Sequence, residues 1–266
     1  MSDAVQALVT HALNYQCSDF DADQLAKARM IVHETLAVGV AGSRATFAAK
    51  LHQAAGAWGS GGECRAMGRG SGLPAASAAL LNAYQIHGQE FDCVHEPAVV
   101  HPMAAIMATA LAELEQRSGG SDETGMSGQQ FLDVICAAVD VAITVGLSAR
   151  TGLRFFRPGT AGAFGAAAVV SRIRGFDAAT ATETFGHMYS QLCGTMQAHT
   201  EGKAVLPVQI GFNARYAVVA GDLASAGISA PQDIVEGPYG YLTLFEPDGD
   251  ISEVLKQLGV VSRITA

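Results

Sequence analysis

The feature that most constrains this chain is the helical spacing of its apolar residues. In the segment 5–13 they recur every three or four positions, which places them on one face of a helix. A second stripe of this kind begins after Asp21 or Asp23, either of which can cap a helix, and ends at Gly42. The same reasoning predicts further helices over Ala45–Trp58, Pro74–Tyr84, Pro102–Gln116, Ser127–Val139, Gly162–Arg174, from Asp177 onward, and Val208–Ala226.

Strand signals are weak in comparison. The sequence contains no alternating run of β-branched residues, and only two places, 66–68 and Tyr241–Phe245, are candidates for a short strand. We therefore predict an all-α fold. No internal repeat or low-complexity linker divides the chain, so we expect residues 1–266 to form one helical domain.

The charge balance and the composition exclude several functional classes. Sixteen basic and 25 acidic residues give a net charge of −9, which argues against a nucleic-acid-binding protein. Only 15% of the residues are charged and 49% are hydrophobic, which excludes disorder and indicates a surface covered by another protein. Together with the Ala- and Gly-rich helices, this predicts a homodimer.

The cellular location is predicted from the lack of membrane-span and signal-peptide patterns in the sequence. No apolar run reaches the ~18 residues of a membrane span, and Met1–Asp3 does not begin a signal peptide. Five scattered cysteines without a CxxC pair indicate reduced thiols. We expect a cytoplasmic protein with no membrane partner.

The densest group of chemically active side chains lies between 87 and 102. Helix ends and loops often carry catalytic groups, and a histidine beside a carboxylate suits a base that works near neutral pH. The candidate catalytic residues are His101, Asp92, Glu90 and His95. The alternative is that these residues merely cap helices.

A metal site is the third interpretation of this segment. Cys93, His95 and His101 are ligand types, but C-x-H-x₅-H is not a zinc spacing, and no fourth ligand is evident. We expect no metal.

Two other segments are rich in groups that bind anions. Arg154 and Arg157 precede a glycine-rich helix start, and such arginines bind carboxylates bidentately. His199 and Lys203 lie in a predicted loop before a helix. These four are the candidate substrate-binding residues, and for each segment the alternative is a solvated loop. Gly162-x-x-Gly165 follows no strand and is therefore not a dinucleotide-binding fingerprint.

Three passages together carry a family resemblance. They are Leu81-Asn82-Ala83 through His87, Phe91-Asp92 and His101-Pro102; Gly159 to Ala166; and Gln209 to Gly227 with Glu236-Gly237-Pro238-Tyr239-Gly240. In this order on a helical chain, they resemble the MmgE/PrpD family over nearly the whole sequence. The resemblance implies small polycarboxylate substrates, no redox or nucleotide cofactor, homodimers, and an active site between a large helical domain and a smaller α/β lid domain. It further implies that this chain is the helical domain and lacks the lid.

The match to the family's site residues is uneven. His101 matches a family active-site histidine, whereas the usual Asp-Asp pair is Asp92-Cys93 here. A histidine expected near Phe156-Arg157 is missing, and the expected lysine and histidine fall near Leu206 and Gln209, three and six residues after Lys203.

The leading hypothesis is a lyase-like enzyme that acts on a small di- or tricarboxylate, by dehydration of a 2-methylcitrate-like hydroxy acid or by a related decarboxylation or epimerisation. His101 would be the acid/base, Glu90 and Asp92 would orient it, and Arg154, Arg157 and Lys203 would bind substrate carboxylates. The competing hypothesis is a catalytically decayed or truncated helical protein that binds polycarboxylates or serves in assembly.

Overall fold

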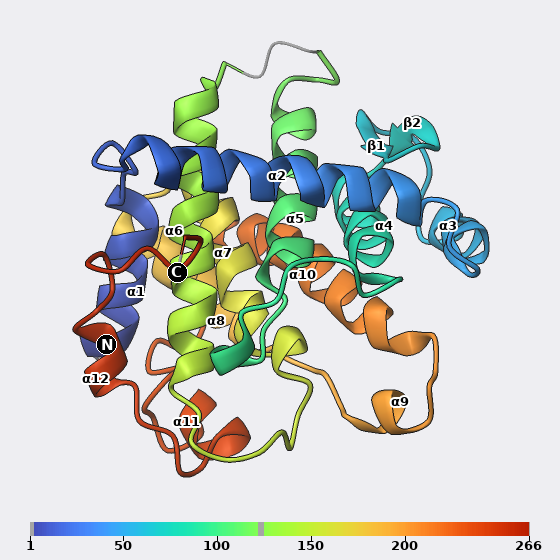
Figure 1. The fold of residues 1–266 in the computed structure, drawn as a ribbon. Helices are drawn as coiled ribbons and strands as arrows, with labels where there is room; N and C mark the ends of the chain where they lie inside the picture. Colours follow the sequence, from blue (N-terminus) through green and yellow to red (C-terminus); the bar gives the residue numbers. More distant parts are fainter. Residues whose placement is uncertain (1–2, 122–124, 266) are drawn as a thin grey trace.

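The computed structural model describes residues 3–121 and 125–265, and the fold is mainly helical, as the periodicity predicts (Figure 1). Short 3-10 turns lie at Glu96–Ala98 and Arg157–Gly159. The helices are α1 (Asp3–Asn14), α2 (Ala22–Gly42), α3 (Ala48–Gly56), α4 (Ala75–His87), α5 (Pro102–Arg117), α6 (Gly128–Leu147), α7 (Ala161–Ile173), α8 (Ala178–Tyr189), α9 (Gln197–Thr200), α10 (Val205–Ser225), α11 (Tyr241–Phe245) and α12 (Ser252–Leu255).

Side-chain caps define the starts of three long helices. The Asp21 carboxylate accepts a hydrogen bond from the backbone N–H of Gln24, so Asp21 rather than Asp23 caps α2. Ser127 caps α6 and Asp177 caps α8 in the same way. The caps predicted at Ser127 and Asp177 are therefore confirmed.

The core is formed by α4, α5, α6, α7 and α10, and most of its side chains are alanine, valine, leucine or isoleucine. These small side chains allow the helix axes to approach closely. Figure 1 shows α2 lying across α6, α5 and α4 on one side of the molecule, and it packs against all three. The core thus holds the end of α4 and the start of α5 in fixed positions.

Helix α6 requires one correction. By length and composition it is the single described helix that qualifies as a candidate membrane span, contrary to the expectation that no segment would qualify. Most of the helix is buried inside the fold, against α7, α5 and α1 among others, which is the usual situation of a core helix in a globular domain.

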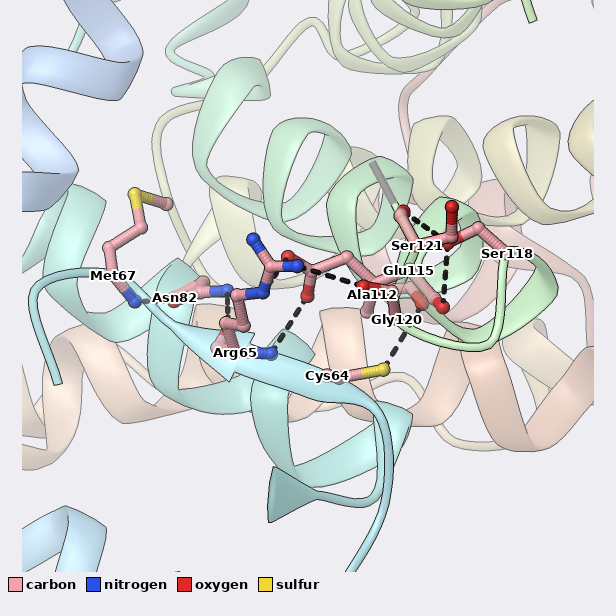
Figure 2. Close-up of polar contacts among 9 residues, drawn as sticks. All are labelled: Cys64, Arg65, Met67, Asn82, Ala112, Glu115, Ser118, Gly120 and Ser121. Atoms are coloured by element: carbon pink, nitrogen blue, oxygen red, sulfur yellow. Dashed lines mark hydrogen bonds and ion pairs between the residues drawn. The ribbon is translucent and has the colours of Figure 1, made fainter. Parts of the chain in front are cut away.

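A small hairpin lies between α3 and α4, in a stretch that is rich in glycine. Strands β1 (Cys64–Ala66) and β2 (Gly70–Leu73) pair antiparallel, and β1 overlaps the predicted strand candidate at 66–68. Figure 2 shows how the buried Asn82 of α4 holds the hairpin: its amide donates to the Arg65 carbonyl at 2.9 Å and accepts from the Met67 N–H at 2.8 Å. The Arg65 N–H in turn donates to Glu115 of α5 at 2.7 Å.

The second strand candidate is wrong, since Tyr241–Phe245 forms α11. The backbone N–H of Leu244 donates to the Gly240 carbonyl, a helical bond, and the Tyr241 ring stacks on Phe245 one turn later at 5.5 Å. A run of five residues is too short for its apolar pattern to separate a strand from a helix.

Two helices begin three residues away from their predicted starts. Helix α3 begins at Ala48 rather than Ala45, and α10 begins at Val205 rather than Val208. Pro207 therefore lies in the first turn of α10, where the missing N–H has no helical partner to lose.

Candidate active site

The segment 88–101, between α4 and α5, carries the most polar group of side chains in the core. It leaves α4 after His87, forms the 3-10 turn at Glu96–Ala98, and enters α5 at Pro102. Asp92 is buried in this segment although it belongs to no helix or strand. A buried carboxylate needs hydrogen-bond donors, and two histidines at the adjoining helix ends supply them.

The three side chains form one compact cluster. His87 Nδ1 lies 3.0 Å from Asp92 Oδ1 and 3.2 Å from Oδ2. His101 Nδ1 lies 3.2 Å from the backbone carbonyl oxygen of Asp92 and 3.5 Å from its Oδ1. The two imidazole rings are 4.8 Å apart and meet edge to face.

This arrangement selects the tautomers of both histidines. An ionised carboxylate and a carbonyl only accept hydrogen bonds, so each Nδ1 must carry the proton. A neutral His101 then has its lone pair on Nε2. Because the His101 side chain is 21% exposed, whereas those of His87 and Asp92 are almost fully enclosed, His101 alone of the three can present that lone pair to a small molecule.

The electrostatics of the pair are consistent with an acid/base group. Burial would raise the pKa of Asp92, but hydrogen bonds and positive charge from His101 and His87 outweigh it, and the pKa lies below its usual value. Burial would lower the pKa of His101, but the bonds and charge of Asp92 outweigh it, with help from Glu90, and the pKa is raised. The carboxylate therefore stabilises a protonated His101.

His87, Asp92 and His101 are also the described group closest to a metal-ligand set, with one possible ligand atom each within 4.8 Å of the others. Among the described residues, no such group contains Cys93 or His95, the other two metal candidates named from the sequence. Within the cluster, His87 Nδ1 is hydrogen-bonded to the carboxylate of Asp92, and His101 Nδ1 is hydrogen-bonded to the backbone carbonyl of Asp92.

Three of the predicted residues do come together in a second place. Glu90, His199 and Lys203 line one pocket of about 450 Å³ between the end of α4 and the start of α10. Neither Lys203 nor His199 is ion-paired with any residue that the structure describes, so both are free to meet an anion. Glu90 adds a negative charge to the same pocket, close enough to His101 to affect its pKa.

His95, another of the predicted catalytic residues, does not line this pocket. Its Nδ1 accepts the N–H of Ala98 at 3.2 Å and so caps the 3-10 turn, which is the alternative considered for this segment. Burial, together with the charge of Arg263, lowers the pKa of His95. The side chain faces a separate, largely apolar pocket of about 440 Å³ that Arg263 also lines.

Arg157 differs most from the prediction. Instead of facing an open pocket, its guanidinium is buried and ion-paired with Glu246, with Nε 2.8 Å from Oε1. It also donates to the carbonyls of Ala98 and Thr151. Since its donors are used inside the protein, the structure does not offer Arg157 to a substrate. Arg154 is exposed on the preceding loop.

His87 is not among the residues predicted to be catalytic. Its position does hint at a contact with Asp92, since it is a histidine in the last turn of a helix, five residues before the aspartate. The helical pattern alone, however, does not reveal that the chain folds back and brings the carboxylate to the ring.

Comparison with known proteins gives a family and several relatives. The model of the MmgE/PrpD N-terminal domain matches residues 6–253. A cis-aconitate decarboxylase of Aspergillus terreus (strain NIH 2624 / FGSC A1156) is 29% identical over 96% of this chain and 54% of its own length. A cis-aconitate decarboxylase-like protein of Aspergillus oryzae is 28% identical over 86% of this chain and 48% of its own. The chain spans about half the length of the curated relatives it matches.

Proposed function

Because this chain belongs to the MmgE/PrpD family, we propose that it acts as a lyase on a small di- or tricarboxylate, with His101 as the general acid/base. The observation that carries the proposal is the orientation of His101. Its Nδ1 is directed at Asp92, so Nε2 is left as the proton acceptor on a partly exposed ring. The names of the relatives, which refer to decarboxylation of cis-aconitate, support a carboxylate substrate.

Two reactions are open to this histidine, and they require opposite protonation states. In a dehydration of a 2-methylcitrate-like acid, neutral His101 takes a proton from the carbon next to a carboxylate, and the electron pair of that C–H bond forms the C=C bond. The C–O bond breaks, and the hydroxyl leaves as water with a proton taken from the solvent. In a decarboxylation, the C–C bond to a carboxylate breaks and CO₂ leaves. Protonated His101 then gives its proton to the carbon that carried the carboxylate.

The pH profile separates these two reactions. The pKa of His101 is raised above its usual 6.5 by Asp92 and Glu90. Dehydration should therefore speed up as the pH rises through that raised value, and decarboxylation should slow down. We would follow kcat/KM from pH 5.5 to 9 with 2-methylcitrate and with cis-aconitate, and His101→Gln should abolish turnover of the true substrate. Turnover of both substrates by His101→Gln at the wild-type rate would contradict the proposal.

For substrate binding we propose Lys203 and His199, which line the 450 Å³ pocket together. A carboxylate there would gain a charge-assisted bond, worth on the order of 1.5–3 kcal/mol. Lys203→Met should therefore weaken citrate binding roughly tenfold or more in calorimetry. Lys256→Met, which removes an exposed lysine that follows α12, is the control and should change nothing.

The competing proposal is a helical polycarboxylate-binding protein without catalysis. It is favoured by Leu206 and Gln209, which stand where the resemblance leads one to expect a lysine and a histidine, and Gln209 is hydrogen-bonded to the backbone of Thr195. Calorimetric binding of citrate or cis-aconitate with no product detected by NMR would favour it. Formation of product at a rate abolished by His101→Gln would exclude it.

We also propose that the chain forms a homodimer in the cytoplasm. The low charged fraction supports the dimer, and the five cysteines, all free thiols, support a reducing compartment. Sedimentation at micromolar concentration tests the first point, and a folded monomer would contradict it. Fluorescence microscopy of the tagged chain tests the second.

A further inference from the structure

The inference concerns His87, a residue that the proposed mechanism does not use. His87 ends α4 and its side chain is 1% exposed, so it does not reach a substrate. Its Nδ1 lies within 3.2 Å of both carboxylate oxygens of Asp92. Its other ring nitrogen, Nε2, is buried with no partner among the described residues. The ring is therefore engaged with Asp92 through one nitrogen and takes no further part.

The fold holds the backbone of His87 more firmly than that of Asp92. His87 belongs to α4, a helix packed against α2, α5 and α10, whereas Asp92 lies in the connecting segment 88–101. A carboxylate on a connecting segment has rotational freedom about its side-chain bonds unless something fixes it. The hydrogen bond from His87, whose helix α4 is packed into the core, supplies that restraint. The same Oδ1 that lies 3.0 Å from His87 Nδ1 also lies 3.5 Å from His101 Nδ1, which in addition contacts the backbone carbonyl of Asp92 at 3.2 Å.

We propose that His87 is a positioning residue, which fixes the Asp92 carboxylate so that Asp92 holds His101 in the Nδ1–H tautomer with Nε2 free. The inference rests on the proposed function in one respect, since it supposes that Nε2 of His101 is the working atom. The arrangement follows the rule that a functional histidine is oriented by a carboxylate, which is itself held by further hydrogen bonds. A neutral imidazole in water prefers the opposite tautomer, so the effect of positioning is visible in the tautomer itself.

The test is a spectroscopic one that does not depend on activity. Long-range ¹H–¹⁵N spectra of ¹⁵N-histidine-labelled protein report which ring nitrogen carries the proton, and His101→Gln assigns the signal of His101. In the wild type we expect His101 to be mainly the Nδ1–H tautomer above its pKa. In His87→Leu we expect a shift toward the Nε2–H tautomer. We also expect the pKa of His101 to fall, because the charge of Asp92 no longer stays beside it. Glu90, the other carboxylate that acts on His101, is unchanged in every variant.

Two conservative variants separate positioning from mere folding. The amide nitrogen of asparagine occupies about the place of Nδ1, so His87→Asn should keep the wild-type tautomer and pKa of His101. The amide of glutamine reaches the place of Nε2 instead, so His87→Gln should behave like His87→Leu. This comparison remains decisive even if His87→Leu fails to fold, because both amides are polar and similar in size.

A matched control comes from another histidine–carboxylate pair. His11 Nε2 lies 3.2 Å from Asp140 Oδ2, and this largely buried pair joins α1 to α6. His11→Leu should leave the signals of His101 unchanged. If turnover is found, His87→Leu should lower kcat about tenfold with little change in KM, and His87→Asn should restore it.

Equal tautomer populations and equal pKa values of His101 in the wild type, His87→Gln and any folded His87→Leu would overturn the inference. An inactive wild type whose His101 nevertheless responds as described would reject the proposed lyase and leave the positioning role established. The two proposals therefore fail in distinguishable ways.

Discussion

Replacing Arg157 by methionine should destabilise the fold far more than replacing an ordinary charged residue. Arg157 and Glu246 have side chains only 4% and 3% exposed, and they are joined by bonds of 2.8 and 3.4 Å. Arg157→Met keeps most of the apolar stem but leaves a buried carboxylate without its counter-charge. Breaking a buried ion pair from one side typically costs about 3–5 kcal/mol. Two carbonyls, those of Ala98 and Thr151, also lose a donor.

The assay is urea unfolding followed by circular dichroism, with thermal unfolding as a second measure. For a domain of this size, 3–5 kcal/mol corresponds to a fall in Tm of roughly 6–20 °C. The double variant Arg157→Met/Glu246→Leu removes both charges. It should recover most of the loss, since apolar replacement of a whole buried pair is often neutral or stabilising. A coupling free energy of about 2 kcal/mol or more between the two sites is therefore expected.

Arg150→Met is the control, because Arg150 pairs with Asp250 at 2.8 Å but both side chains are substantially exposed. Exposed pairs contribute about 0–1 kcal/mol, so this variant should unfold almost as the wild type does. If Arg157→Met instead lowered the free energy of unfolding by less than ~1 kcal/mol and abolished citrate binding, the guanidinium would be a substrate-binding group. That result would refute its role in stabilising the fold.

Three further predictions concern the hairpin, the connecting segment and pH. Asn82→Leu should lower the free energy of unfolding by about 1–3 kcal/mol in urea, because the backbone groups of Arg65 and Met67 lose their hydrogen-bond partner. An unchanged midpoint would argue against a stabilising role of these two bonds. Val99→Gly should be neutral or stabilising by up to about 1 kcal/mol, since φ at Val99 is 52°, and a clear loss of stability would show that no strain is stored there. The raised pKa of His101 means that its contribution to stability is fully present below about pH 6.5 and is lost as the pH rises through the raised value. The stability difference between the wild type and His101→Gln should therefore shrink between pH 6 and 9, and a constant difference would contradict the ion pair with Asp92.

Much of the fold follows from local signals in the sequence. Apolar spacing predicts the long helices, and the caps at Ser127 and Asp177 are predicted to the residue because a cap depends on neighbours two or three positions away. The errors arise where distant contacts decide the conformation. The hairpin at 64–73 exists because Asn82 and Glu115 bind its backbone, and neither contact is visible in the strand residues themselves.

The candidate site shows the same difference between local and distant contacts. Residue types and spacing correctly place His101 beside Asp92, since both belong to one short segment. The pairing of Arg157 with Glu246, 89 residues apart, has no local signal, so the sequence alone does not distinguish a buried, paired arginine from one that faces an open pocket. A predicted anion site needs donors that are free as well as positive, and only the folded chain shows which ones are free.

The ion pair and the catalytic candidates are nevertheless connected. Glu90 and Val99 are the two described non-glycine residues with positive φ, and both lie in the segment that carries Asp92. Strained backbone persists only where the surroundings fix it, and here the residues flanking Val99, Ala98 and Val100, are fully buried. The Arg157 guanidinium donates to the carbonyl of Ala98, one residue before the strained position. Arg157 therefore acts on the site by holding the segment between α4 and α5 in its strained shape, so its loss should disturb the Asp92–His101 pair without any direct contact with a substrate.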